Sequence, residues 1–180
     1  MTGRVLFLVV CAAGPADYIA DMVRLAQADG WEVRCLATEA ATTHFLDLDE
    51  LAALTGHAVR TGHQGAGQPG LPKPDAVVVA PATYNTINKW AAGIADNYVL
   101  IQLAELTGLG VPIAVLPFVN TALAANCVFQ RSVNELRDAG VTVLFGEGGF
   151  VPHPPRTGGQ AMASYPWHRA LEAVARATKR

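Results

Sequence analysis

Charged side chains and cysteines are both scarce in this chain of 180 residues. Only 16% of the residues are charged, and 13 lysine and arginine residues stand against 15 aspartate and glutamate residues. This balance excludes the basic surface that nucleic-acid binding requires, and the acidic excess is too small to indicate a basic partner. We therefore expect a globular protein with no nucleic-acid partner.

The three cysteines, Cys11, Cys35 and Cys127, are too few and too far apart for a disulfide framework or a structural zinc site. Cys11 and Cys35 lie within apolar strand patterns, so we interpret them as small buried hydrophobic residues. No group of His, Cys, Asp and Glu has the spacing of metal ligands, and neither a G-x-S-x-G elbow nor a Walker sequence occurs. We expect no bound metal ion.

The apolar run at residues 5–13 resembles the hydrophobic part of a signal peptide, but it is far too short to span a bilayer. A single arginine precedes it, and it continues into a helix pattern that contains charged residues. We interpret the run as a first strand, and we expect a cytoplasmic protein with no membrane partner.

Apolar, β-branched segments alternate with helix patterns about five times along the chain. The predicted strands cover residues 4–10, 31–37, 76–80, 111–116 and 141–145. Continuous apolar runs of this length are typical of parallel strands that are buried on both faces. The alternation predicts an α/β fold in three layers (α/β/α), with a doubly wound parallel sheet and a single domain over residues 1–180.

The stretch from residue 74 to residue 90 carries the clearest sign of a ligand site. An apolar strand is expected to end at Pro81, because proline cannot donate to a central ladder, and a helix pattern resumes at Ile87. The residues between them are small or polar, namely Ala82, Thr83, Asn85 and Thr86. Ligands of open α/β sheets bind beyond the carboxyl ends of the strands, and hydroxyls, amides and free helix N–H groups suit a polar or anionic group.

Asn120 holds the corresponding place after another predicted strand, three residues beyond Pro117. Both Asn85 and Asn120 have a simpler interpretation, as a turn former and a helix N-cap respectively. Thr38 is expected to cap a helix and to lie near a bound phosphate, since both roles use the same geometry.

Two segments have the composition of loops, residues 59–73 and residues 146–159. The second is rich in glycine and proline and contains His153 and Arg156, which could close over an anionic substrate. We interpret residues 146–159 as a candidate substrate lid, and the alternative is a surface loop without substrate contact.

The segment Pro81–Thr86 resembles the PASANT motif of the homo-oligomeric flavin-containing cysteine decarboxylases. The similarity continues through residues 87–97, which match I-x-K-x-A-x-G-I-A-D-N, and residues 30–41 are similar to the family's second strand and turn. Residues 117–120 resemble the start of the family motif P-x-M-N-x-x-M-W. This family includes phosphopantothenoylcysteine decarboxylases and lantibiotic-type peptidyl-cysteine decarboxylases.

The resemblance implies a Rossmann- or flavodoxin-like fold and FMN bound between subunits of a homotrimer or of a dodecamer. Carried over by position, the residues around the flavin or its phosphate would be Ala12, Ala13, Gly14, Thr38, Pro81, Ala82, Thr83, Asn85 and Thr86. The substrate would contact Asn85, Pro117, Asn120, His153 and Arg156. The implied reaction is the oxidative decarboxylation of a cysteine carboxylate, most simply the C-terminal cysteine of a peptide, to an enethiol.

The sequence also departs from the family pattern. The register of the family's catalytic histidine falls on Gly67, so His63, four residues earlier, is the provisional base, with Asn120 as the second catalytic residue. The final Met-Trp of the second motif is replaced by Leu123-Ala124, which predicts a different substrate pocket. The late loop lacks the cysteine that re-reduces the enethiol in phosphopantothenoylcysteine decarboxylase, so the oxidised product is expected.

Two other functions stay open at this point. The chain could bind FMN for different chemistry, either another redox reaction or prenyl transfer. It could also be a non-catalytic flavin-binding regulator of another protein.

Overall fold

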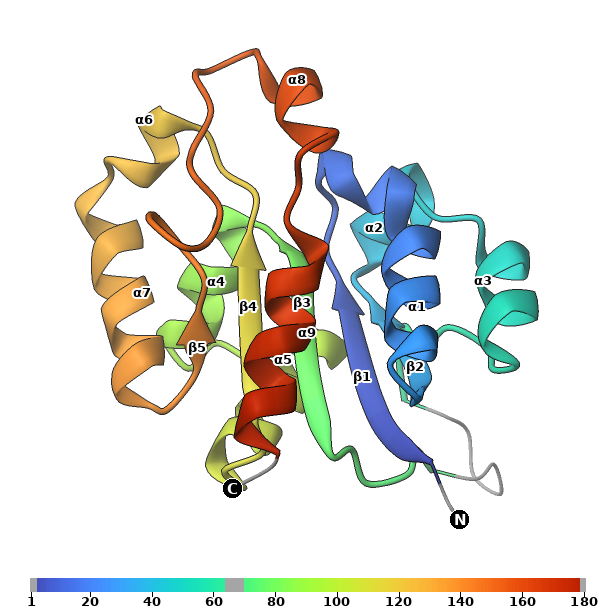
Figure 1. The fold of residues 1–180 in the computed structure, drawn as a ribbon. Helices are drawn as coiled ribbons and strands as arrows, with labels where there is room; N and C mark the ends of the chain where they lie inside the picture. The colour runs from blue at the N-terminus through green and yellow to red at the C-terminus, as the bar shows by residue number, and fades with distance from the viewer. Residues whose placement is uncertain (1–2, 64–69, 179–180) are drawn as a thin grey trace.

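A computed structural model describes residues 3–63 and 70–178 of the chain. Five strands form one parallel sheet in the order β2-β1-β3-β4-β5 (Figure 1). Their bounds are β1 (Arg4–Val10), β2 (Trp31–Ala37), β3 (Ala76–Ala82), β4 (Ile113–Pro117) and β5 (Thr142–Val143). The predicted parallel α/β sheet is confirmed, although β5 keeps only two of the five residues expected.

Helices cover both faces of the sheet. On one face lie α1 (Ile19–Ala28) and α9 (Trp167–Ala177), and on the other lie α4 (Tyr84–Ala91), α5 (Tyr98–Gly108) and α7 (Cys127–Asp138). Shorter elements complete the chain, namely η1 (Gly14–Tyr18), α2 (Glu39–His44), α3 (Leu48–Thr55), α6 (Thr121–Ala124) and α8 (Gly158–Met162). Alternate residues of each strand point to opposite faces, so the sheet separates two hydrophobic clusters.

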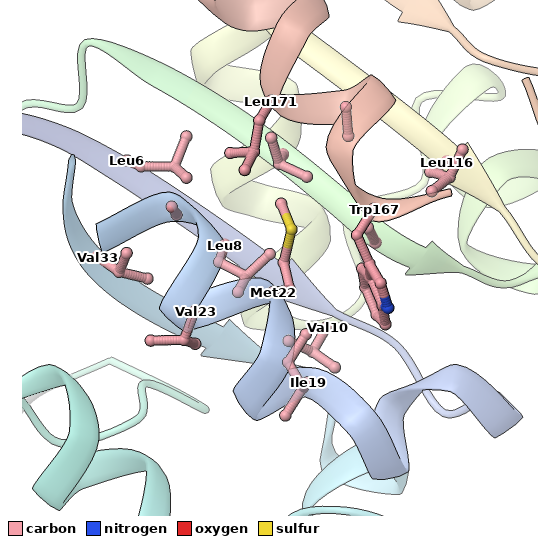
Figure 2. Packing of buried hydrophobic residues seen from close by; sticks show 14 of the residues in the cluster. Leu6, Leu8, Val10, Ile19, Met22, Val23, Val33, Leu116, Trp167 and Leu171 are labelled. Atoms are coloured by element: carbon pink, nitrogen blue, oxygen red, sulfur yellow. The ribbon is translucent and has the colours of Figure 1, made fainter. Parts of the chain in front are cut away.

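The first cluster is formed mainly by β1, β2, β3, α1 and α9. Figure 2 shows Met22 and Val23 of α1 and Leu171 and Trp167 of α9 packed over Leu8 of β1. Met22 and Leu8 are fully buried, and such dense burial makes the sheet a rigid platform for whatever lies at its edge.

All strands are parallel, so their carboxyl ends lie along one edge of the sheet, at the top of Figure 1, together with α2, α6 and α8. The strand order reverses between β1 and β3, because β1 leads to β2 on one side while β3 leads to β4 on the other. This reversal is a topological switch point, where ligands of doubly wound folds bind.

Two expectations about local structure were wrong. Pro81 does not end β3, because the strand continues to Ala82 through a cis Ala80–Pro81 peptide, and the Pro81 carbonyl still accepts a hydrogen bond from the Cys11 N–H. The following helix begins at Tyr84, three residues earlier than expected, because Thr83 caps it. The described residues of segment 59–73 lie outside every helix and strand, as expected of a loop, and Arg60 forms an isolated bridge with Leu36 beside β2. Gly67 lies outside the described residues.

Within the described ranges, every helix falls short of the length and apolar character needed to cross a bilayer.

The structure predicts that the thiols differ sharply in reactivity. Cys11 and Cys35 are buried, and burial raises the pKa of both, that of Cys35 to about 12, whereas Cys127 is exposed. Because the thiolate is the nucleophile, native protein should react with a disulfide reagent at one thiol and unfolded protein at three. A Cys127→Ser variant should lose the fast phase, and a second fast-reacting thiol in native protein would contradict the buried positions.

Candidate functional site

The turn after β3 forms the start of α4 at the switch point. The Thr83 hydroxyl accepts a hydrogen bond from the Thr86 N–H at 3.2 Å and donates to the Thr86 hydroxyl at 3.0 Å. Capping leaves the N–H groups of Tyr84 and Asn85 in the first turn without intrahelical acceptors. The positive end of this helix, with the exposed amide of Asn85, therefore suits an anionic or hydrogen-bonding ligand.

The Thr86 side chain is directed into the protein, whereas the Asn85 side chain is exposed. Thr86 is buried, with 4% of its surface exposed, and it hydrogen bonds to the thiol of Cys11 as well as to Thr83. The burial of Cys11 raises its pKa, and these hydrogen bonds only partly oppose that rise. The Thr86 hydroxyl thus ties the end of β1 to the end of β3.

The turn after β1 lies directly beside the turn after β3. The Cys11 N–H donates to the Pro81 carbonyl at 3.1 Å, and Ala12 and Ala13 are half-buried. At Gly14, a Cβ atom would lie 2.5 Å from the sulfur of Met162 in α8. The missing side chain of Gly14 therefore makes room for α8, and any cofactor contact at this residue would use its main chain.

Thr38 follows β2 at the same edge. Its hydroxyl accepts a hydrogen bond from the Ala41 N–H at 3.3 Å, and its own N–H donates to the Val10 carbonyl at 3.0 Å. The predicted N-cap is confirmed, and the second bond fixes the start of α2 against the end of β1.

The exit from β4 brings Pro117 and Asn120 to this edge as well. The Phe118 N–H donates to the Ala82 carbonyl at 2.9 Å, which holds the exit of β4 against the end of β3. Asn120 is the N-cap of α6, and its Oδ1 atom accepts from the Leu123 N–H at 3.0 Å. This bond uses the acceptor of the amide and leaves its NH₂ group able to donate to a ligand.

The late loop folds back over the same edge. The His153 carbonyl accepts from the Thr121 N–H at 2.8 Å, and the imidazole lies 5.0 Å from the Phe118 ring, centroid to centroid. Tyr165 anchors the segment's far end by donating its hydroxyl to the Leu116 carbonyl at 2.5 Å. The burial of Tyr165 raises its pKa well above the usual range, so it stays a neutral donor.

Arg156 occupies an unusual place in this loop. It is exposed and has a φ of 69°, the only positive φ of a non-glycine residue in the described parts of the chain. The Thr157 N–H donates to the Pro154 carbonyl at 3.2 Å, so residues 154–157 form a turn with Arg156 in the position that favours glycine or asparagine.

His63 is not brought to the other candidates. Its exposed ring contacts Tyr98, at the start of α5, with 5.0 Å between centroids, and it follows the segment that bridges to β2. Within the described residues, no hydrogen bond or ring contact joins the His63 side chain to Asn85 or Asn120.

Three residues that no sequence motif indicated pack the late loop against the sheet edge, namely Phe118, Met162 and Tyr165. No local pattern marks these residues, because their contacts join segments that are far apart in the chain.

The family model described as Flavoprotein matches residues 1–166. The chain belongs to this family. Among curated relatives of this flavoprotein, the coenzyme A biosynthesis bifunctional protein CoaBC of Mycolicibacterium smegmatis is 31% identical over 154 residues, which are 80% of this chain and 35% of that protein. A cysteine/cysteine sulfinic acid decarboxylase from an unknown prokaryotic organism is 33% identical over 70 residues, 39% of this chain and 19% of that protein. The chain thus spans about a third or less of these relatives.

Solved structures with the same fold include FMN-dependent cysteine decarboxylase SpaF, with 24% identity, a TM-score of 0.66, and coverage of 96% of this chain and 97% of that chain. A mutant PPC decarboxylase in complex with pantothenoylaminoethenethiol has 20% identity, a TM-score of 0.68, and coverage of 91% and 96%. At these identities the structures establish the shared fold, and with the family match they confirm the resemblance predicted from the PASANT-like motif.

Proposed function

We propose that this flavoprotein binds FMN at the β1/β3 switch point and oxidatively decarboxylates a cysteine carboxylate, that of the C-terminal cysteine of a peptide. The observation that carries the proposal is the PASANT-like turn at the carboxyl end of β3, inside a chain that matches the Flavoprotein family over residues 1–166. The similarity in fold to cysteine decarboxylases supports this choice of chemistry.

The residues at the switch point fit a flavin nucleotide. Ala12, Ala13 and Ala82 have small side chains, so a planar ring could approach the main chain closely at the ends of β1 and β3. The N–H groups of Tyr84 and Asn85, and the capped start of α2 at Thr38, are suitable neighbours for the phosphate. We propose that Gly14, Pro81, Thr83 and Thr86 shape this site through their main chain and their internal hydrogen bonds.

When bound, FMN would supply the electron sink that accepts a hydride from the cysteine Cβ atom. The chain's own groups would hold the substrate: the Asn120 NH₂ group and Asn85 would donate to its carboxylate beside Pro117, and Arg156 could add a charge-assisted bond. The substrate would lose the thiol proton and a hydride from Cβ, and departure of CO₂ followed by protonation of the sulfur would give an enethiol. Residues 146–159 contain no cysteine that could reduce this product, so we propose that the protein releases it as the enethiol. We also propose that residues 146–159 form a lid over the bound substrate.

We propose a homotrimer or a dodecamer with FMN at the subunit interface. The exposed apolar side chains of Ile94 and Val128, 47% and 39% accessible, support an interface beside α4 and α7.

The proposal is tested on purified protein. We expect a yellow protein whose released cofactor has the mass of FMN, and peptides ending in cysteine should lose the mass of CO₂ plus two hydrogens. A peptide that ends in serine is the control and should stay unchanged, because it has no thiol to oxidise. Colourless protein that refuses added FMN would remove the flavin site, and yellow protein that leaves every cysteine peptide intact would remove the decarboxylation alone.

A further inference from the structure

We propose that His153, rather than His63, is the acid–base residue of the site. This inference rests on the proposed function and assigns a residue to its proton transfer.

In the step, the thiol S–H bond breaks and its proton moves to Nε2 of His153. Bound FMN would supply the acceptor for the hydride that leaves Cβ as the C=S bond forms. Loss of CO₂ then moves the electron pair of the Cα–carboxyl bond into a Cα=Cβ bond, and the C=S electrons move onto sulfur. Protonation of that sulfur by the imidazolium gives the enethiol and restores the base.

The position of His153 is set by its main chain. A bridge joins His153 to Asn120, and the His153 carbonyl accepts from the Thr121 N–H at 2.8 Å. The histidine therefore lies beside the amide that we propose as the carboxylate contact. A thiol is only two bonds from the α-carbon that carries the carboxylate, so a base for it must lie next to the carboxylate contact.

The orientation and tautomer of the imidazole are also fixed. Nδ1 lies 2.8 Å from the Pro154 carbonyl, and because a carbonyl only accepts, Nδ1 must carry the hydrogen. The neutral ring therefore has its lone pair on Nε2, as a general base requires. Phe118 and Phe150 pack on the ring with centroids at 5.0 Å and 6.3 Å, which holds it in one plane.

Gly158 of α8 packs closely against the imidazole. A Cβ atom at this position would lie 3.3 Å from Cε1 of His153, which is a tight contact, and 3.5 Å from Nε2, which is an ordinary one. The same loop holds Arg156 in a backbone conformation that residues with side chains seldom adopt. Unfavourable backbone conformations cluster at functional sites, so this turn has a second, independent sign of function.

His63 lacks these features. Its ring is exposed and contacts the Tyr98 ring edge-on at the start of α5, with 5.0 Å between centroids.

The test compares His153→Gln with His63→Gln in FMN-loaded protein, with His168→Gln on the exposed face of α9 as the control. General acid–base catalysis contributes about 100-fold or more, so His153→Gln should lower kcat by at least about 100-fold while FMN stays bound. The other two variants should retain turnover. Gly158→Ala keeps His153 but presses on its ring at Cε1, where the added Cβ would lie 3.3 Å away, so it should also lower kcat by displacing the imidazole. This variant guards against a folding defect in the histidine variant.

A second readout does not depend on turnover. Nitrogen NMR of the ¹⁵N-histidine-labelled protein at mildly alkaline pH should show His153 with its hydrogen on Nδ1 and a free lone pair on Nε2. A hydrogen on Nε2, or wild-type turnover in His153→Gln, would overturn the proposal, as would loss of turnover in His63→Gln alone. If the FMN-loaded wild type leaves the cysteine peptide intact, the proposed function itself has failed.

Discussion

Replacing Asn120 with aspartate is expected to lower turnover of a cysteine-ended peptide by roughly 10- to 1,000-fold while the fold survives. Two like charges about 4 Å apart repel by about 1–4 kcal/mol between water and a protein surface, and the substrate carboxylate would meet the new one. The donor NH₂ group is lost as well. Aspartate caps helices as well as asparagine does, so the bond to the Leu123 N–H at 3.0 Å should persist.

The chain offers a matched control at Asn126. This residue is the N-cap of α7, with its Oδ1 atom accepting from the Val128 N–H, two residues on, at 2.9 Å, and it is not among the residues of the proposed site. Asn126→Asp should leave kcat and KM unchanged, so it separates a capping defect from a defect in the site. Steady-state kinetics and circular dichroism check both variants. If Asn120→Asp turned over peptide at the wild-type rate, Asn120 would be a helix cap and nothing more.

Most of the sheet could be predicted because its strands are buried on both faces and read as continuous apolar runs. The edge strand β5 could not, since its short ladder depends on pairing with β4 alone and the apolar run 141–145 extends beyond that pairing. Pro81 shows a related limit. The rule that proline ends a strand concerns the missing N–H, yet here the residue contributes its carbonyl to Cys11 and the strand continues.

The candidate site could be predicted in part for the same reason. Thr38, Thr83 and Asn120 follow strand ends, and parallel strands bring such residues to one edge whatever the details of packing. The fold of the late loop could not be predicted, because it depends on contacts such as Met162 on Gly14. The sequence suggests His63 as base only because it lies four residues before Gly67, where the family's catalytic histidine would fall. The structure is needed to show that the His63 ring lies against Tyr98.

Truncating Phe129 to alanine is expected to cost about 3–5 kcal/mol of unfolding free energy, the usual cost for a buried phenylalanine. Phe129 is fully buried in α7, stacks on Tyr84 with centroids 5.7 Å apart, and meets the Phe145 ring edge-on at 5.3 Å. It therefore joins α7, α4 and the segment after β5, and alanine would leave a cavity that all three border.

The same truncation should weaken FMN binding, although Phe129 lies below the site. Tyr84 is the first residue of α4, so losing its stacking partner should loosen the turn at Thr83 that presents the free N–H groups. Leu109→Ala is the control, because that side chain is 67% exposed and its loss should cost less than about 0.5 kcal/mol. Urea unfolding of the apoprotein and FMN titration by fluorescence measure the two effects separately. Loss of stability with unchanged FMN affinity would mean that Thr83 and its hydrogen bonds alone hold the turn in place.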